Sequence, residues 1–131
     1  MAVTVQIKRV YEAADAADGL RVLVDRLWPR GIAKAKLHHD LWCKDLGPST
    51  DLRNWFGHQP ERWPQFRRDY TVELQADSAQ TLMRSIAQAV QGRATITLLY
   101  GAKDTEHNQA VVLADELRTF LKNHPDLITT S

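Results

Sequence analysis

The sequence contains one cysteine, Cys43, among its 131 residues. A single cysteine excludes an internal disulfide, so we expect a reducing compartment such as the bacterial cytoplasm. No apolar run approaches the ~20 residues that a membrane-spanning helix needs. Residues 1–10 alternate polar and apolar side chains and lack the charged head and apolar core of a secretory signal. We therefore expect a cytoplasmic protein with no membrane partner.

The short motifs of familiar chemistries are also missing. There is no glycine-rich dinucleotide fingerprint, no Walker phosphate loop, no His-Glu-x-x-His and no Gly-x-Ser-x-Gly. The usual spacing of zinc ligands is absent as well. A net charge of +1 argues against a surface that coats nucleic acid broadly. Function must therefore be inferred from where reactive side chains stand relative to the expected strands and helices.

Charge is distributed unevenly along the chain. Residues 21–68 hold ten Lys and Arg side chains against five acids, a net charge of +5, whereas residues 69–131 carry −3. A locally positive surface suits an anionic ligand. The same segment contains all four tryptophans, which also suit base stacking with single-stranded nucleic acid. A nucleic-acid or protein-binding module built on residues 21–68 is therefore one alternative.

Apolar spacing predicts strands at residues 3–10, 20–25 and 94–100. It predicts helices within four segments, with a further short helix near 36–46. The four segments are 48–57, 59–74, 77–92 (capped by Ser78) and the stretch from 109 to Pro125. This alternation predicts one α/β domain over residues 1–131, with a small, largely parallel sheet of three or more strands flanked by helices.

Two loops follow buried strands, at residues 25–31 and 100–108. In open α/β sheets ligands bind outside the carboxyl ends of the strands, so the two loops are expected to face one another. An anion such as phosphate or carboxylate would be clamped by Arg26 and Arg30 beside Trp28. Further binding candidates are Lys44, Ser49 and Asn108. The tentative catalytic groups for proton transfer are Tyr100 and Asp104.

Structural roles are open for the same residues. Arg26 can pair with Asp25 or Asp104, Arg30 can bind a helix C-terminus, and Ser49 can be a helix N-cap. A haem or metal site is a further alternative. Its ligands would come from His38, His39, Cys43, His58 and Tyr100.

Several blocks of sequence resemble the YeaO-like family, a group classed as a domain of unknown function (DUF488). The blocks are DGLRVLVDRLWPRG, LWCKDLGPS, LRNWFGHQPERWPQFRRDYTVEL and TLLYGAKDTEHNQAVVL, and the resemblance extends from about residue 7 to residue 121. It implies a small bacterial cytoplasmic α/β protein and no established reaction or cofactor. Members are sometimes labelled tetrapyrrole methyltransferases, but this chain is short for that activity and shows no methyl-donor loop. Two positions, Cys43 and Gly47, depart from the family pattern. The departure at Cys43 argues against a general catalytic role for the thiol.

Overall fold

The computed structural model describes residues 3–127. Within them lies a four-stranded, all-parallel sheet with the strand order β1-β4-β2-β3. The strands are β1 (Thr4–Arg9), β2 (Leu20–Leu23), β3 (Leu41–Trp42) and β4 (Thr95–Tyr100). The central strand β4 pairs with β1 from Thr4 opposite Thr95 onward, and with β2 from Leu20 opposite Ile96 onward. The predicted α/β class with a parallel sheet flanked by helices is confirmed.

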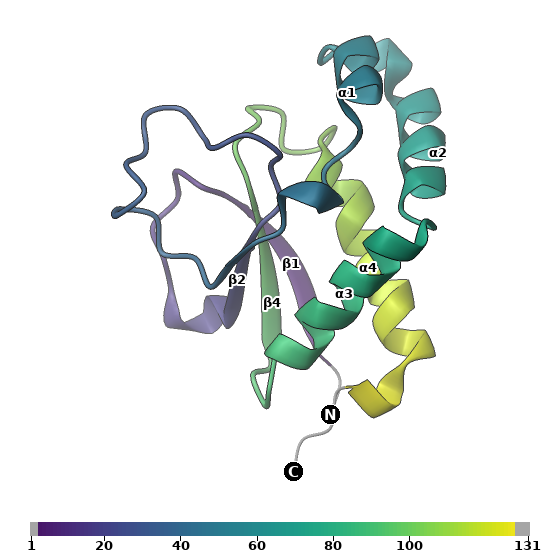
Figure 1. The fold of residues 1–131 in the computed structure, drawn as a ribbon. Coiled ribbons are helices and arrows are strands. Elements are labelled where there is room, and N and C mark those ends of the chain that lie inside the picture. The colour runs from purple at the N-terminus through teal and green to yellow at the C-terminus, as the bar shows by residue number, and fades with distance from the viewer. Residues whose placement is uncertain (1–2, 128–131) are drawn as a thin grey trace.

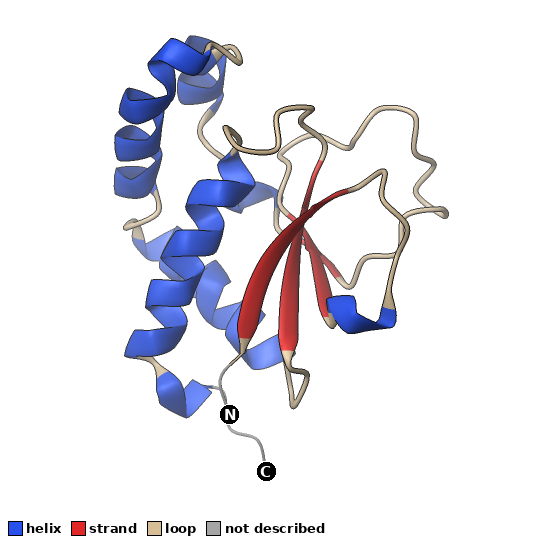
Figure 2. Cartoon of the chain, turned by 180° about the vertical axis from the view of Figure 1, so that it is seen from behind, coloured by secondary structure: helices blue, strands red, loops and turns tan. Residues whose placement is uncertain are grey.

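In the part of the chain that the structure describes, four α-helices connect and cover the strands. They are α1 (Thr50–Phe56), α2 (Trp63–Glu73), α3 (Asp77–Ala89) and α4 (Gln109–Asn123). Figures 1 and 2 show these helices gathered on one side of the sheet, with the long connection between β2 and β3 on the other side. No helix within residues 3–127 is long and apolar enough to cross a membrane.

The two faces of the sheet carry different cores, because consecutive strand residues point to opposite faces. On the helix side, Val22, Ile96 and Leu98 pack into the main core. On the other side, Leu23 and Leu99 form a smaller cluster under the connection that contains Trp28. Because both faces are covered, the sequence at the end of β2 has three apolar residues in a row, Val22, Leu23 and Val24, instead of alternating apolar and polar residues.

The helix nearest the carboxyl terminus follows its sequence pattern closely. Helical spacing of its apolar residues predicts an inward face of five side chains, and all five are buried: Ala110, Leu113, Leu117, Phe120 and Leu121. The side chain of Asn108 caps the helix by accepting a hydrogen bond from the backbone N–H of Val111.

Three local predictions were wrong. The α3 helix begins at Asp77 after Ala76, so Ser78 is inside the helix and does not cap it. Residues 36–46 contain the short strand β3 and a single 3-10 turn at Lys44–Leu46 instead of an α-helix. The spacing of Leu52, Trp55 and Phe56 predicts one buried helix face, but Trp55 does not join the other two in the core, since 40% of its surface remains exposed.

One glycine is required by close packing before β2. Gly19 has a φ of +62°, and a Cβ atom there would lie 2.2 Å from the carbonyl oxygen of Thr95 in β4. Only glycine combines that backbone conformation with such a close approach. The turn into β2 is therefore held against the start of the central strand.

Candidate functional site

A cleft of about 380 Å³ opens at the carboxyl edge of the sheet. Its lining joins the two loops that the sequence singled out, 25–31 and 100–108, with the end of α1, one residue of α2 and the first residue of α4. The first loop contributes residues 25–30, and the second contributes Gly101, Ala102, His107 and Asn108. Tyr11 and Pro48 complete the wall. The expectation that the two strand-end loops meet at one edge is met because β2 and β4 are parallel neighbours.

Asp25 is the residue that joins the two loops. Its Oδ2 atom accepts a hydrogen bond from the backbone N–H of Gly101 at 2.8 Å. Its Oδ1 atom accepts from the side-chain amide of Gln109 at the start of α4. Burial of the carboxyl raises the pKa of Asp25 to about 6, although both hydrogen bonds act in the opposite direction. Among the described residues that line the cleft, Asp25 is the only acid.

The Arg26 side chain is held by backbone carbonyl groups of the protein. Its guanidinium donates hydrogen bonds to the carbonyl oxygens of Gly47 at 2.9 Å and Pro48 at 3.1 Å. The nearest carboxylate is that of Asp45, 3.7 Å away. Neither Asp25 nor Asp104, the two partners considered from the sequence, forms an ion pair with it. Arg26 therefore fixes the segment that leads into α1 while part of its side chain lines the cleft.

Two other arginines line the cleft without such ties. Arg30 is exposed and Arg53 of α1 is partly buried. Within residues 3–127, neither guanidinium has an ion-pair or hydrogen-bond partner. His58 and His107 lie in the same lining. Three arginines and one carboxyl therefore line this cleft.

Trp28 lines the cleft and also packs against the loop that follows it and against Trp42. Its indole N–H donates to the carbonyl oxygen of Ile32 at 2.6 Å. Its ring packs edge-on against that of Trp42, with 5.4 Å between the ring centroids. The indole N–H of Trp42 in turn donates to the backbone carbonyl of Asp25 at 2.7 Å. The two tryptophans therefore hold the main chain at the end of β2 in place.

The tentative catalytic residues lie outside the cleft lining. Tyr100 points into the main core and is 2% exposed. Burial raises its pKa, and the Glu12 carboxylate adds to this shift. Asp104 accepts hydrogen bonds from the backbone N–H groups of Glu106 and His107, which lower its pKa, and from the His107 ring. The catalytic assignment of Tyr100 and Asp104 stays a prediction.

Three predicted binding residues have structural contacts. Asn108 lines the cleft, but its side chain caps α4 and donates to the carbonyl oxygen of Asp104. Ser49 caps α1, and its hydroxyl and N–H both donate to the Glu73 carboxylate, at 2.6 and 2.8 Å. Lys44 lies over the Trp42 ring. Neither Lys44 nor Ser49 is part of the cleft lining.

The residues considered for haem or metal are not gathered into a site. In the described part of the chain, no three His, Cys, Asp or Glu side chains are grouped so that they could hold a metal ion. Burial, with the nearby Asp45 carboxylate, raises the pKa of the Cys43 thiol to about 11. The thiol therefore stays protonated and a poor nucleophile at neutral pH.

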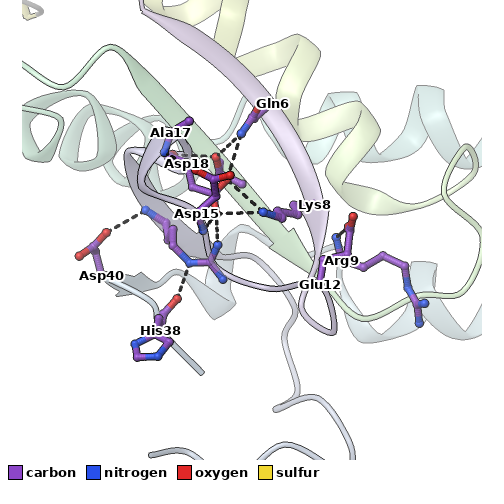
Figure 3. A network of polar contacts seen from close by, with 11 residues as sticks. Gln6, Lys8, Arg9, Glu12, Asp15, Ala17, Asp18, His38 and Asp40 are labelled. Carbon is purple, nitrogen blue, oxygen red and sulfur yellow. Dashed lines mark hydrogen bonds and ion pairs between the residues drawn. The ribbon is translucent and has the colours of Figure 1, made fainter. Parts of the chain in front are cut away.

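A second polar cluster lies on the same sheet face as Trp28, towards the other end of the strands. Asp18, 3% exposed, receives the ammonium group of Lys8 at 3.2 Å and the guanidinium of Arg21 (Figure 3). Burial acts to raise the pKa of Asp18, but the Asp15 N–H and these two cations outweigh it and lower the pKa. The Arg21 guanidinium also donates to the carbonyl oxygen of His38. Since every buried side-chain polar atom of the described residues has a partner, this cluster is a completed structural network.

Comparison with known proteins shows which family the chain belongs to. The family model described as "Inactive DUF488-N3 subclade" matches residues 4–131. The chain belongs to the DUF488 family. It is 46% identical over 116 residues to "Uncharacterized protein YeaO" of Escherichia coli, a match that covers 88% of this chain and 97% of that protein. It is 42% identical over 113 residues to "Uncharacterized protein Rv3073c" of Mycobacterium tuberculosis, covering 86% and 92%. No solved structure matches the chain significantly.

Family membership confirms the YeaO-like resemblance read from the sequence blocks. None of the matched names states a ligand or a reaction. The role of the cleft must therefore be argued from its own side chains.

Sequence reasoning missed Asp25 as a cleft residue and considered Arg53 only as a partner of Ser49 in binding an anion. Asp25 ends the apolar run of β2 and starts the loop, so its position at the carboxyl end of a buried parallel strand was the available signal. Arg53 could not be found that way. It reaches the cleft only because α1 is folded back over the sheet edge, which is a tertiary relationship.

Proposed function

We propose that this protein binds a small anion, phosphate or carboxylate, in the cleft between the loops at 25–31 and 100–108. The observation that carries this proposal is the pair Arg30 and Arg53, which line one cleft with no carboxylate partner among residues 3–127. Guanidinium groups bind such anions through paired, charge-assisted hydrogen bonds.

The wall of the cleft supports a ligand larger than a bare ion. Beside the cations it presents apolar surface from Leu27, Phe56 and Phe66. A volume of about 380 Å³ falls within the usual range for small-molecule sites. We infer binding without turnover as the primary role, in keeping with the word "inactive" in the family description.

Titration calorimetry with inorganic phosphate tests the proposal. We expect heat of binding with the wild-type protein and a loss of affinity of about tenfold or more in Arg53→Ala and in Arg30→Ala, since each removes a charge-assisted hydrogen bond. The matched control is Arg84→Ala, an exposed arginine on α3 that is not in the cleft lining. Equal affinity in all four proteins, or no binding to the wild type, would overturn the proposal.

A further inference from the structure

We propose that the cleft selects oxyanions that carry a proton at neutral pH, such as hydrogen phosphate and hydrogen arsenate, over proton-free oxyanions such as sulfate, because the Asp25 carboxylate accepts that proton in a hydrogen bond. This inference rests on the proposed function and names the ligand class of the same site. It also separates phosphate from simple carboxylates, which carry no proton at neutral pH.

The position of Asp25 supports this role. Each of its oxygens has one donor within the protein, the N–H of Gly101 for Oδ2 and the amide of Gln109 for Oδ1. A carboxylate oxygen can accept about two hydrogen bonds, so each oxygen can accept one more. Because Asp25, Gly101 and Gln109 all line the cleft, a ligand bound there can supply that donor.

The carboxyl is also held in place. A Cβ atom at residue 101 would lie 3.0 Å from Oδ2, so the loop after β4 packs tightly against it. The Trp42 indole fixes the backbone carbonyl of Asp25 from the other side. An anion bound in the cleft therefore cannot displace the carboxylate easily.

Hydrogen phosphate and sulfate have the same shape, and they differ in that hydrogen phosphate carries one proton. Hydrogen phosphate has a hydroxyl that donates to a carboxylate, whereas every sulfate oxygen is a negatively charged acceptor. Two acceptors that face each other without a proton repel, and an unfavourable pairing of this kind rejects a ligand. The pKa of Asp25, about 6, leaves this carboxyl mainly ionised at neutral pH and ready to accept.

The remaining charged groups of the cleft do not distinguish the two ions. Arg26, Arg30, Arg53, His58 and His107 all act as donors or cations towards either anion. Measured at one pH and one ionic strength, their contributions to the two affinities are similar. The ratio of the affinities therefore reports mainly on Asp25.

The test is a calorimetric comparison of four anions with the wild-type protein at about pH 7.5 and constant ionic strength. Phosphate and arsenate carry a proton there, whereas sulfate and molybdate do not. We expect the first pair to bind at least about tenfold more tightly than the second, the order of discrimination that an unpaired polar group in a site produces. This comparison needs no variant, so it stands even if a substitution impairs folding.

Asp25→Asn is the matching variant. The side-chain amide of asparagine can donate to a sulfate oxygen, so we expect the preference to fall to about one while Arg84→Ala keeps it. Equal affinity of the wild-type protein for all four anions would overturn this inference and leave anion binding intact. A preference that persists in a folded Asp25→Asn protein would also overturn it. Absence of binding by every anion would overturn the proposed function itself.

Discussion

The Oδ2 atom of Asp25 lies 2.8 Å from the backbone nitrogen of Gly101, and this hydrogen bond joins the end of β2 to the loop that follows β4. This hydrogen bond requires the two segments, the end of β2 and the loop after β4, to approach closely at the edge of the sheet. The half-buried Asp25 lines the same cleft as Arg26, Arg30 and Arg53.

Gly101→Ala should destabilise the protein by about 1–3 kcal/mol, the usual cost of forcing a methyl group into a packed site. The added Cβ atom would lie 3.0 Å from Asp25 Oδ2, so the carboxyl or the loop must shift. Urea denaturation measures the change. Gly92→Ala is a less suitable comparison, because its φ of +82° adds backbone strain. A stability equal to wild type would mean that the Asp25 contact is not tight.

The raised pKa of Asp25 predicts how stability depends on pH. The pKa is 3.8 for the ordinary group and about 6 in the folded protein, so the folded state binds more protons between those values. Stability from this group is therefore full below about pH 4 and lost as the pH rises through about 6, a change of about 3 kcal/mol.

Other carboxyls titrate in the same range, so the informative quantity is the difference between wild type and Asp25→Asn. We expect the variant to gain about 3 kcal/mol relative to wild type between about pH 4 and pH 7, measured by denaturation in a buffer without phosphate. A difference that stays constant across this range would show that Asp25 titrates normally.

Ser49→Ala separates the structural role of this residue from the binding role predicted from sequence. Loss of the N-cap hydroxyl and of its bond to Glu73 should lower stability by about 1–2 kcal/mol. Phosphate affinity should stay at the wild-type value, because Ser49 is not part of the cleft lining. A stable variant with weakened phosphate binding would instead support the sequence-based assignment.

The Asp18 network predicts strong coupling between buried charges. Asp18→Ala leaves the Arg21 guanidinium, 7% exposed as a residue, without its carboxylate and should cost about 3–5 kcal/mol. The double variant Asp18→Ala with Arg21→Met should recover part of that loss, because the uncompensated charge is gone. Thermal denaturation of the single and double variants measures the coupling. Additive losses would mean that the two side chains act independently.

Much of the fold could be predicted from local pattern. The buried strands and the amphipathic α4 helix are visible because apolar residues repeat with the period of a strand or a helix. The short strand β3 could not be seen, since two residues, Leu41 and Trp42, carry no period. Trp55 was assigned to the core by spacing, but α1 is only seven residues long and leaves that side chain at its outer face.

The location of the candidate site could be predicted from the sequence, but the contacts of its individual side chains could not. Parallel pairing of β2 and β4 brings residues 25–31 and 100–108 together, as the sequence predicts if the two buried runs are neighbouring parallel strands. Whether an arginine faces a ligand or the protein depends on which acceptors the fold brings near it. Arg26 meets the carbonyl oxygens of Gly47 and Pro48, acceptors that no sequence pattern marks.

The central claim is that an anion binds at this cleft, and phosphate titration followed by ¹H–¹⁵N NMR tests it most directly. The account predicts that the shifted signals cluster at the backbone N–H of Gly101, the side-chain amide of Gln109 and the Nε–H groups of Arg30 and Arg53, with Arg84 unchanged. Signals that do not move, or that move only at residues far from the cleft such as Arg21 or Arg84, would contradict it.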